Sequence, residues 1–434
     1  MTGFFRPGPD LVLVQQIVCC HYAVNEVLFP RDCRITGNSL PVNKLFHCWI
    51  AGSKDCFLIE KRVKKKFYKI GISGSYGGLN LGDEAILHSI IENLKGSLPV
   101  KIRVFSRNPE DTRKRHDIQK AIDVRGLSMD EIKPEIKDLD LFILGGGGIL
   151  YNSQVQNYLR EVTIAIEYHI PVMVYAIGAD PITDNSFAKL IRETFNKVDI
   201  LTVRDRNSKK ILENTGVTRE IIVTADPALL LKPEKLPDEV NKTMIPGNKK
   251  KLVGFSVREP GKAAPGLDEQ EYHSLLANAA DFIIDRLEAD IMFIPMETRE
   301  RDQQHSHAVI SLMQKPQQAS VLKGEYTSGQ LLSMMDNFSF AVGMRLHFLI
   351  FAFLRNIPIV GLPYSPKVEL FLEELGLAIP PIRQVNAGRL IAYIDRFWDN
   401  QKEIRQQIKN KLPELQEKAA QTNSLLVDFI RENL

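Results

Sequence analysis

From residue 67 onward, short apolar segments alternate with longer amphipathic segments. The short segments have the length of strands, and the longer ones have the polar and apolar spacing of helices. This alternation is typical of a parallel sheet with helices on both faces, because parallel strands are usually joined by helical crossovers. We therefore predict an α/β fold with strands at residues 67–72, 100–105, 139–144, 172–177, 200–203, 221–224, 252–257, 289–294, 320–322, 338–342 and 357–361.

The alternation is interrupted between residues 232 and 251, where three prolines and many charged residues occur without periodicity. Such a segment is typical of an interdomain linker. A chain of 434 residues is also too long for one ordinary hydrophobic core. The predicted architecture is two doubly wound, Rossmann-like domains that face a crevice. The predicted boundaries are a first domain at 67–235, a linker at 236–251 and a second domain with carboxy-terminal helices at 252–434.

Residues 1–66 lack this strand and helix pattern and contain all five cysteines of the chain. An odd number of cysteines with irregular spacing does not indicate a disulfide framework, and no Cys-x-x-Cys pair indicates zinc or redox chemistry. We interpret this segment as an appendage, either disordered or the product of a wrongly assigned start. The cysteine-free remainder fits the reducing cytoplasm, and a cytoplasmic location is our expectation.

Composition excludes some classes of protein. The net charge of +3 is small for this length, so nucleic-acid binding is not predicted. The most apolar early run, Leu11 to Val24, is interrupted by Gln15, Gln16 and His21, and a membrane span needs roughly 20 mostly apolar residues. We predict no span, while peripheral association with membrane-bound assembly enzymes stays open. No Gly-x-Gly-x-x-Gly or Walker sequence occurs, which disfavours a dinucleotide or P-loop site.

Glycine dominates the segments that follow the strands of the predicted first domain. Residues 74–83 and 145–148 are rich in glycine, and Asp83 and Glu84 follow the first of these loops. Ligands of open parallel sheets bind at the carboxyl ends of strands, where glycine permits close backbone approach. The alternative interpretation is that the glycines form tight turns and that Asp83 and Glu84 only favour the start of a helix.

Cationic residues follow the strands of the predicted second domain. Arg345 and His347 lie at the start of the apolar helix predicted at 348–354, where positive charge opposes the helix dipole. Sequences that break a local rule often do so at functional sites, so we predict an anion site there. A semi-buried structural Arg and His is the alternative. Lys367 opens the next junction between a strand and a helix, so it can point into the same crevice.

Other histidines give weaker signals. His305 and His307 lie two residues apart in a charged stretch, without a His-x-x-x-His or carboxylate pattern around them. We therefore predict no metal site. No Ser/His/Asp arrangement can be singled out, since no serine lies in a nucleophile elbow.

Short motifs along the chain resemble the polysaccharide pyruvyltransferase family. The resemblance covers about residues 67–385 and excludes the first 66. Two features depart from the family pattern: the first loop is longer and richer in glycine, and Glu297 stands where the family often has Gln. The matching motifs, in chain order, are Gly82-Asp83-Glu84-Ala85-Ile86-Leu87, Leu144-Gly145-Gly146-Gly147, Ile177-Gly178, Thr202-Val203-Arg204-Asp205, Thr224-Ala225-Asp226-Pro227, Pro295-Met296 with Asp302, Met344-Arg345-Leu346-His347 and Tyr364-Ser365-Pro366-Lys367-Val368.

The resemblance implies a fold similar to two-domain (GT-B type) glycosyltransferases and a reaction without a cofactor. Members of the family take phosphoenolpyruvate as donor and attach pyruvate as a ketal that bridges two hydroxyls of a sugar. The acceptor is a cell-surface polysaccharide or its lipid-linked oligosaccharide precursor, and phosphate is released.

The resemblance also implies residue roles. Arg204, His347 and Lys367 match the donor site, and Arg345 is adjacent to it. His347 is our candidate general acid, because an imidazole can titrate near neutrality. The acceptor would be oriented or deprotonated by one of three carboxylates, Asp83, Glu84 or Asp226.

Two other functions remain as alternatives. A nucleotide-sugar-dependent glycosyltransferase would share the fold, but many such enzymes carry a Glu-x7-Glu pattern, and no two glutamates after residue 250 have this spacing. A non-catalytic sugar-binding protein on the same fold is the second alternative. The joint presence of Arg204, Arg345, His347 and Lys367 argues against it.

Overall fold

The computed structural model describes residues 67–237, 251–259, 268–297 and 301–434. The predicted appendage at 1–66 and most of the predicted linker lie outside these residues. Residues Phe67–Leu434 form one compact unit. Among the helices of the described part, none combines the length and the apolar composition needed to span a bilayer.

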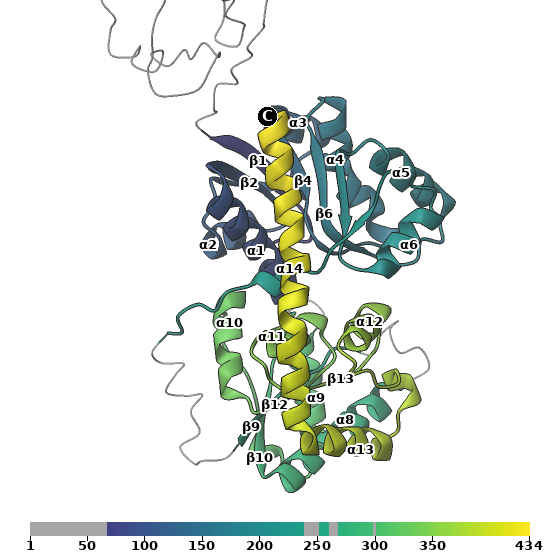
Figure 1. The fold of residues 1–434 in the computed structure, drawn as a ribbon. Coiled ribbons are helices and arrows are strands. Elements are labelled where there is room, and N and C mark those ends of the chain that lie inside the picture. The colour runs from purple at the N-terminus through teal and green to yellow at the C-terminus, as the bar shows by residue number, and fades with distance from the viewer. Residues whose placement is uncertain (1–66, 238–250, 260–267, 298–300) are drawn as a thin grey trace, which may run out of the picture. The chain divides into compact units, whose positions relative to one another are not determined.

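The first sheet lies between residues 68 and 223 (Figure 1). All its strand pairs are parallel, and the order is β3-β2-β1-β4-β6-β7-β8, with β5 also paired to β6. Helix α1 packs on one face, and α3, α4 and α5 on the other, so the sheet is doubly wound. The elements are β1 (Tyr68–Ser73), α1 (Leu81–Ser97), β2 (Val100–Ser106), α2 (Pro109–Arg115), β3 (Lys120–Asp123), α3 (Met129–Lys137), β4 (Leu141–Leu144), β5 (Gly147–Leu150), α4 (Val155–Glu167), β6 (Val172–Ala179), α5 (Asn185–Phe195), β7 (Ile200–Val203), α6 (Arg206–Asn214), β8 (Ile222–Val223) and the short 3-10 helix η3 (Pro227–Leu230).

The second sheet lies between residues 251 and 361 and is also parallel, in the order β11-β10-β9-β12-β13. The two parallel-sheet domains predicted from the sequence are therefore confirmed. The elements are β9 (Lys251–Ser256), α8 (Glu269–Leu287), β10 (Ala289–Phe293), α9 (Asp302–Leu312), β11 (Ala319–Val321), α10 (Ser328–Met334), β12 (Phe340–Gly343), α11 (Leu346–Leu354), β13 (Ile359–Gly361), α12 (Pro366–Glu374), α13 (Ala387–Asp399) and α14 (Gln401–Asn433).

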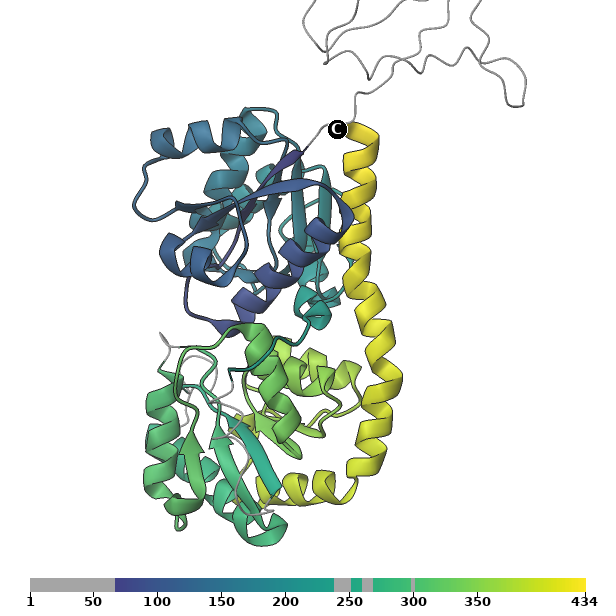
Figure 2. The same cartoon turned by 90° about the vertical axis from the view of Figure 1, so that its left-hand side faces the viewer.

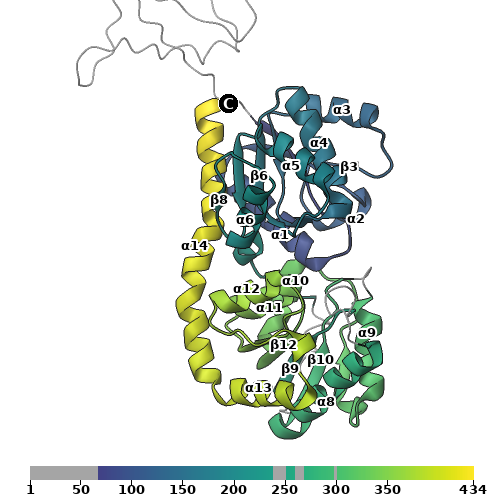
Figure 3. The same cartoon turned by 90° about the vertical axis from the view of Figure 1, so that its right-hand side faces the viewer.

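The long helix α14, yellow in the ribbon, connects the two sheets along their sides (Figure 2 and Figure 3). Near its start, Arg405 donates to the carbonyl of Ser339, which precedes β12. Further along, Thr422 is hydrogen bonded to Thr224 of the first sheet at 2.8 Å. The apolar core under α1 and that of the second sheet form one continuous cluster of buried side chains. Because both sheets share this core, the start of α1 is held against the second sheet.

Two strands were missed by the sequence analysis. Strand β3 has only four residues, and its two outer residues are the charged Lys120 and Asp123, so it shows no apolar run. Strand β5 begins inside the glycine run, where Gly148 pairs with Gly178 of β6. The interpretation of residues 145–148 purely as tight turns is therefore corrected. Strand β6, by contrast, is buried along its whole length, as expected for a central parallel strand.

Both sheets reverse their strand order at one place, which fixes where a ligand site is expected. In the first sheet the reversal lies between β1 and β4, whose last residues Ser73 and Leu144 are paired. In the second it lies between β9 and β12, where Ser256 pairs with Gly343. Ligands of open α/β sheets bind beyond the carboxyl ends of strands at such switch points.

Candidate active site

Arg345 follows the switch point of the second sheet directly and is held by two carboxylates. Its Nε and Nη2 donate to the two oxygens of Asp302, at 3.0 and 2.5 Å, and its Nη1 donates to Glu297 at 3.1 Å. Burial would lower the pKa of Arg345, but Asp302 raises it above the ordinary value, so the guanidinium stays charged. Arg345 was predicted to contact the donor. The structure places its guanidinium between the carboxylates of Asp302 and Glu297.

Glu297 and the preceding residue also hold the start of α1 against the second sheet. The backbone N–H of Leu81 donates to Met296 at 2.9 Å, and the Asn80 side-chain amide donates to Glu297 at 3.1 Å. Asn80 is the N-cap of α1, and its side-chain oxygen accepts from the N–H groups of Gly82 and Asp83. The first turn of α1, with Asp83, thus faces residues of the second sheet.

His347 lies in the first turn of α11, as the sequence predicted, and its ring contacts α1. A Cβ atom added to Gly82 would lie 1.9 Å from His347 Nδ1, so the ring is packed on the glycine backbone. On its other side, His347 Nε2 lies 3.6 Å from an oxygen of Asp226. This nitrogen is buried and has no hydrogen-bond partner among the described residues. A buried polar atom of this kind calls for an explanation, and a ligand atom would supply one.

Asp226 and Arg204 form a buried pair beside His347. Arg204 Nη1 donates to Asp226 at 3.1 Å, and both side chains are 7% exposed. Burial would raise the pKa of Asp226, but His347 and Arg204 outweigh it and hold this pKa below the ordinary value. Asp226 was one of three predicted acceptor residues. The structure places it beside Arg204 and His347, two of the predicted donor residues.

The backbone of the first sheet fits closely around Arg204. A Cβ atom on Gly178 of β6 would lie 2.7–2.9 Å from three atoms of the Arg204 guanidinium, so a larger residue would displace that group. Burial would lower the pKa of Arg204, but Asp226 and Asp205 raise it. The Ile177-Gly178 motif therefore supports the Arg204 motif through direct packing.

Lys367 lies in the first turn of α12 and belongs to a cationic group around Tyr364. Arg258, which follows β9, donates to the Tyr364 hydroxyl at 3.0 Å and lies over its ring. Burial would raise the pKa of Tyr364, but Lys367, Arg258 and Arg345 lower it below the ordinary value. Within the described residues, Lys367 acts on Asp83 and Tyr364 at longer range and forms no close side-chain hydrogen bond or ion pair. It is therefore available to an anion in a way that Arg345 is not.

Asp83 interacts electrostatically with both of the cationic groups described above. The pKa of its carboxyl is raised by burial, while His347, Arg107 and Lys367 act in the opposite direction. Gly147, with φ of +97°, approaches the same carboxylate, since a Cβ atom there would lie 3.3 Å from Asp83 Oδ1. A carboxylate with a raised pKa close to an imidazole can accept a proton, which suits a general base.

Glu84 does not join this group, although it is adjacent to Asp83 in the sequence. It is 2% exposed, and its two oxygens are bonded to His116 Nε2 at 2.8 Å and to the Gly77 N–H at 2.9 Å. Both interactions connect α1 to the glycine-rich loop and to the end of α2. Both oxygens of Glu84, one of the three predicted acceptor residues, are therefore engaged within the protein and not with Asp83.

A polar pocket in the first sheet was not found by sequence reasoning. It lies beyond the ends of β1, β2 and β3, and two of its lining residues, Arg107 and Tyr158, interact electrostatically with Asp83. Its charged and hydroxyl groups suit a ligand rich in hydroxyls. The lining side chains that carry polar groups are Ser73, Arg107, Arg125, Asn157, Tyr158, Arg160 and Glu161.

Because Gly82 contacts His347, one methyl group added at Gly82 should lower turnover, whereas the same addition elsewhere on the helix should not. Gly82→Ala should displace the His347 ring and lower turnover by about 100-fold, the cost that a 1 Å misplacement can have. Gly96 lies on the same helix with no atom within 4 Å of an added Cβ. Gly96→Ala should keep full turnover and stabilise the protein by about 0.5–1 kcal/mol. Steady-state kinetics and thermal melting of both variants check this, and equal turnover in the two would contradict the packing.

Comparison with known proteins decides which family these residues belong to. A family model described as polysaccharide pyruvyl transferase matches residues 80–366. The chain belongs to the polysaccharide pyruvyl transferase family. The match covers the first turn of α1, Arg204, Asp226, Arg345 and His347, and ends one residue before Lys367.

One curated relative and several solved structures are similar to this member of the pyruvyl transferase family. The amylovoran biosynthesis protein AmsJ of Erwinia amylovora is 23% identical over 399 residues, which cover 78% of this chain and 94% of AmsJ. A glycosyltransferase from Rickettsia africae has a TM-score of 0.58 at 14% identity, covering 85% of this chain and 100% of its own. UDP-GlcNAc 2-epimerase from Neisseria meningitidis has a TM-score of 0.56 at 12% identity, with 84% and 100% covered. At these identities the structural likeness shows the fold alone, and that fold agrees with the predicted GT-B type.

Proposed function

We propose that this protein transfers the pyruvyl group of phosphoenolpyruvate to two hydroxyls of a sugar, forming a ketal and releasing phosphate. The observation that carries the proposal is the buried Nε2 of His347, which lies 3.6 Å from Asp226 and makes no hydrogen bond within the described residues. A proton held at this atom can be delivered to a bound substrate, because no protein group in the described residues takes it up by hydrogen bonding. The family to which the chain belongs supports the same reaction class.

The donor fits the cations near His347. Phosphoenolpyruvate carries a phosphate and a carboxylate, which need cations and N–H donors. Lys367 acts on Asp83 and Tyr364 at longer range and forms no close ion pair within the described residues, so it is our candidate for the phosphate. Arg204 forms an ion pair with Asp226. It would contact the carboxylate of phosphoenolpyruvate while keeping this ion pair intact. Arg345, bound to Asp302, would fix the backbone from which His347 projects.

The reaction balances with one acid and one base. His347 donates its proton to the methylene carbon of phosphoenolpyruvate, and the central carbon becomes electrophilic. The first sugar hydroxyl forms a C–O bond with that carbon and gives its proton to Asp83, whose raised pKa suits this role. The C–O bond to phosphate then breaks, and the proton taken up by Asp83 passes to the departing phosphate. The second hydroxyl adds to the same carbon and gives its proton to His347, which restores both residues to their starting state. The products are the ketal and inorganic phosphate.

The acceptor would lie on the first-sheet side of Asp83 and reach, with one hydroxyl, the narrow polar pocket of about 20 Å³ beyond β1, β2 and β3. Tyr158 and Asn157 line this pocket with groups that can donate to and accept from sugar hydroxyls. The relative AmsJ is described by its role in amylovoran biosynthesis, which supports a polysaccharide or its precursor as acceptor. A cytoplasmic location, where phosphoenolpyruvate is formed, is part of the same proposal.

Product analysis in heavy water tests the proposal. The purified protein is incubated in D2O with phosphoenolpyruvate and a panel of methyl glycosides that carry neighbouring free hydroxyls, and phosphate release and product mass are followed. We expect phosphate release that depends on the glycoside, and a ketal whose methyl group carries one deuterium. A product that keeps the vinyl group and contains no deuterium would contradict ketal formation. Transfer from a UDP- or GDP-sugar in a parallel reaction would favour the glycosyltransferase alternative.

A further inference from the structure

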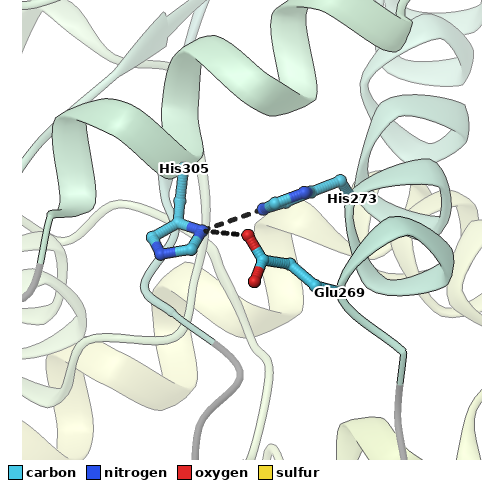
Figure 4. Close-up of side chains that lie close together, drawn as sticks. All are labelled: Glu269, His273 and His305. Carbon is cyan, nitrogen blue, oxygen red and sulfur yellow. Dashed lines mark hydrogen bonds and ion pairs between the residues drawn. The ribbon is translucent and has the colours of Figure 1, made fainter.

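Three side chains with metal-ligating atoms converge between α8 and α9, away from the residues of the proposed reaction (Figure 4). They are Glu269 and His273 on α8 and His305 on α9. Glu269 and His273 are four residues apart on one helix and therefore share a face. The sequence analysis predicted no metal site at His305, because its partners lie more than 30 positions earlier in the chain and cannot be paired with it from spacing alone.

The geometry brings one atom of each residue to a common centre. His273 Nε2 and His305 Nδ1 are 2.9 Å apart, and an oxygen of Glu269 lies 3.9 Å from His305 Nδ1. All three ligand atoms lie within 4.8 Å of one another. A tetrahedral zinc ion with bonds of about 2.0–2.1 Å keeps its ligand atoms roughly 3.3 Å apart, and the observed separations bracket this value. Small rotations of the side chains would therefore complete the coordination.

The surroundings favour a cation as well. Both histidines are buried, whereas the side chain of Glu269 is 66% exposed. Burial lowers the pKa of His273, and His305 lowers it further, which favours the neutral form that coordinates metal ions. The exposed carboxylate leaves one side of the centre open to water, as in sites that have two histidines, one glutamate and a bound water.

We propose that Glu269, His273 and His305 bind a divalent transition metal ion of the zinc and cobalt class. Two imidazoles and a carboxylate suit these ions, while magnesium and calcium prefer ligand sets made of oxygen atoms. The ion ties α8 to the first turn of α9. Asp302, three residues before His305, is the buried partner of Arg345, so the metal supports the helix that holds this pair.

The test uses the purified full chain, stripped with a chelator and titrated with Zn²⁺ or Co²⁺. We expect Zn²⁺ to raise the melting temperature, and Co²⁺ to give visible absorption bands of a four- or five-coordinate centre. His305→Gln should weaken binding by more than the roughly 10–100-fold typical of losing an outer-shell partner. Glu269→Gln alters an exposed side chain, so that variant should fold normally and still show weaker binding.

His307→Gln is the matched control, because His307 lies on the same helix but is exposed and outside the cluster. This variant should bind both ions as the unmodified protein does. Absence of any metal effect, or equal metal effects in His305→Gln and His307→Gln, would overturn the site and leave a hydrogen-bonded histidine pair. Because the readouts are melting and absorption, failure of this site is distinguishable from failure of the proposed pyruvyl transfer.

Discussion

His347→Ala is expected to lower turnover by about 10²–10⁴-fold, the range that follows the loss of a general acid. The reason is that Nε2 is the buried imidazole atom that faces Asp226 without a hydrogen bond among the described residues. Steady-state kinetics with phosphoenolpyruvate and a glycoside identified by the product analysis measure the effect. The change should fall mainly on kcat, because the donor contacts proposed for Lys367 and Arg204 are kept.

Two further variants distinguish a general acid at His347 from a histidine with only a structural role. His307→Ala removes an exposed histidine of α9 and should leave turnover unchanged. Lys367→Ala should raise the KM for phosphoenolpyruvate with a smaller change in kcat, since its role is to bind charge. Near-normal turnover in folded His347→Ala, measured with an acceptor that the unmodified enzyme uses, would show that another group donates the proton.

Arg345→Met is expected to destabilise the protein by about 3–5 kcal/mol, because it leaves the carboxylate of Asp302 buried without its partner. Asp302 is completely buried and accepts both donors of the Arg345 fork. Asp302 also accepts hydrogen bonds from the backbone N–H groups of Met296 and Glu297. The loop that contains these two residues, which contacts the start of α1, should therefore loosen when the Arg345–Asp302 pair is lost. Urea unfolding measures the loss in free energy of unfolding.

Arg355 offers a matched control on the surface of the same domain. It makes a similar two-pronged bond to Asp336, but its side chain is 29% exposed and that of Asp336 is 52% exposed. Arg355→Met should therefore cost about 1 kcal/mol or less. Equal losses in Arg345→Met and Arg355→Met would contradict the view that the Arg345 pair is a buried anchor.

Much of the fold could be predicted because its strands are buried on both faces. Strands β6 and β12 are continuous apolar runs bounded by glycine, and such runs are visible in the sequence. Strand β3 could not be found in this way, since its ends are charged. The pairing of β5 with β6 depends on a register between glycines, which carry no side-chain pattern.

The sequence indicated the candidate site residues that follow strands, but it did not indicate the side chains with which those residues pair. Arg345 and His347 stand out because cations at a helix start are locally unfavourable. That Arg345 is bound by Asp302, and that Glu84 is turned away from Asp83 toward His116, depends on which side chains packing brings together. For the same reason, the sequence did not reveal the cluster of Glu269, His273 and His305, because its members come from two helices.

The measurement that most directly tests the central claim is thermal melting of the purified protein with phosphoenolpyruvate or with nucleotide sugars, because it needs no known acceptor. A ligand that binds only the folded state stabilises it by about 2.7 kcal/mol at 100 times its dissociation constant. Millimolar phosphoenolpyruvate should raise the melting temperature, and the rise should shrink in Lys367→Ala but not in Lys402→Ala, which changes an exposed lysine of α14. A rise with UDP- or GDP-sugars and none with phosphoenolpyruvate would contradict the account.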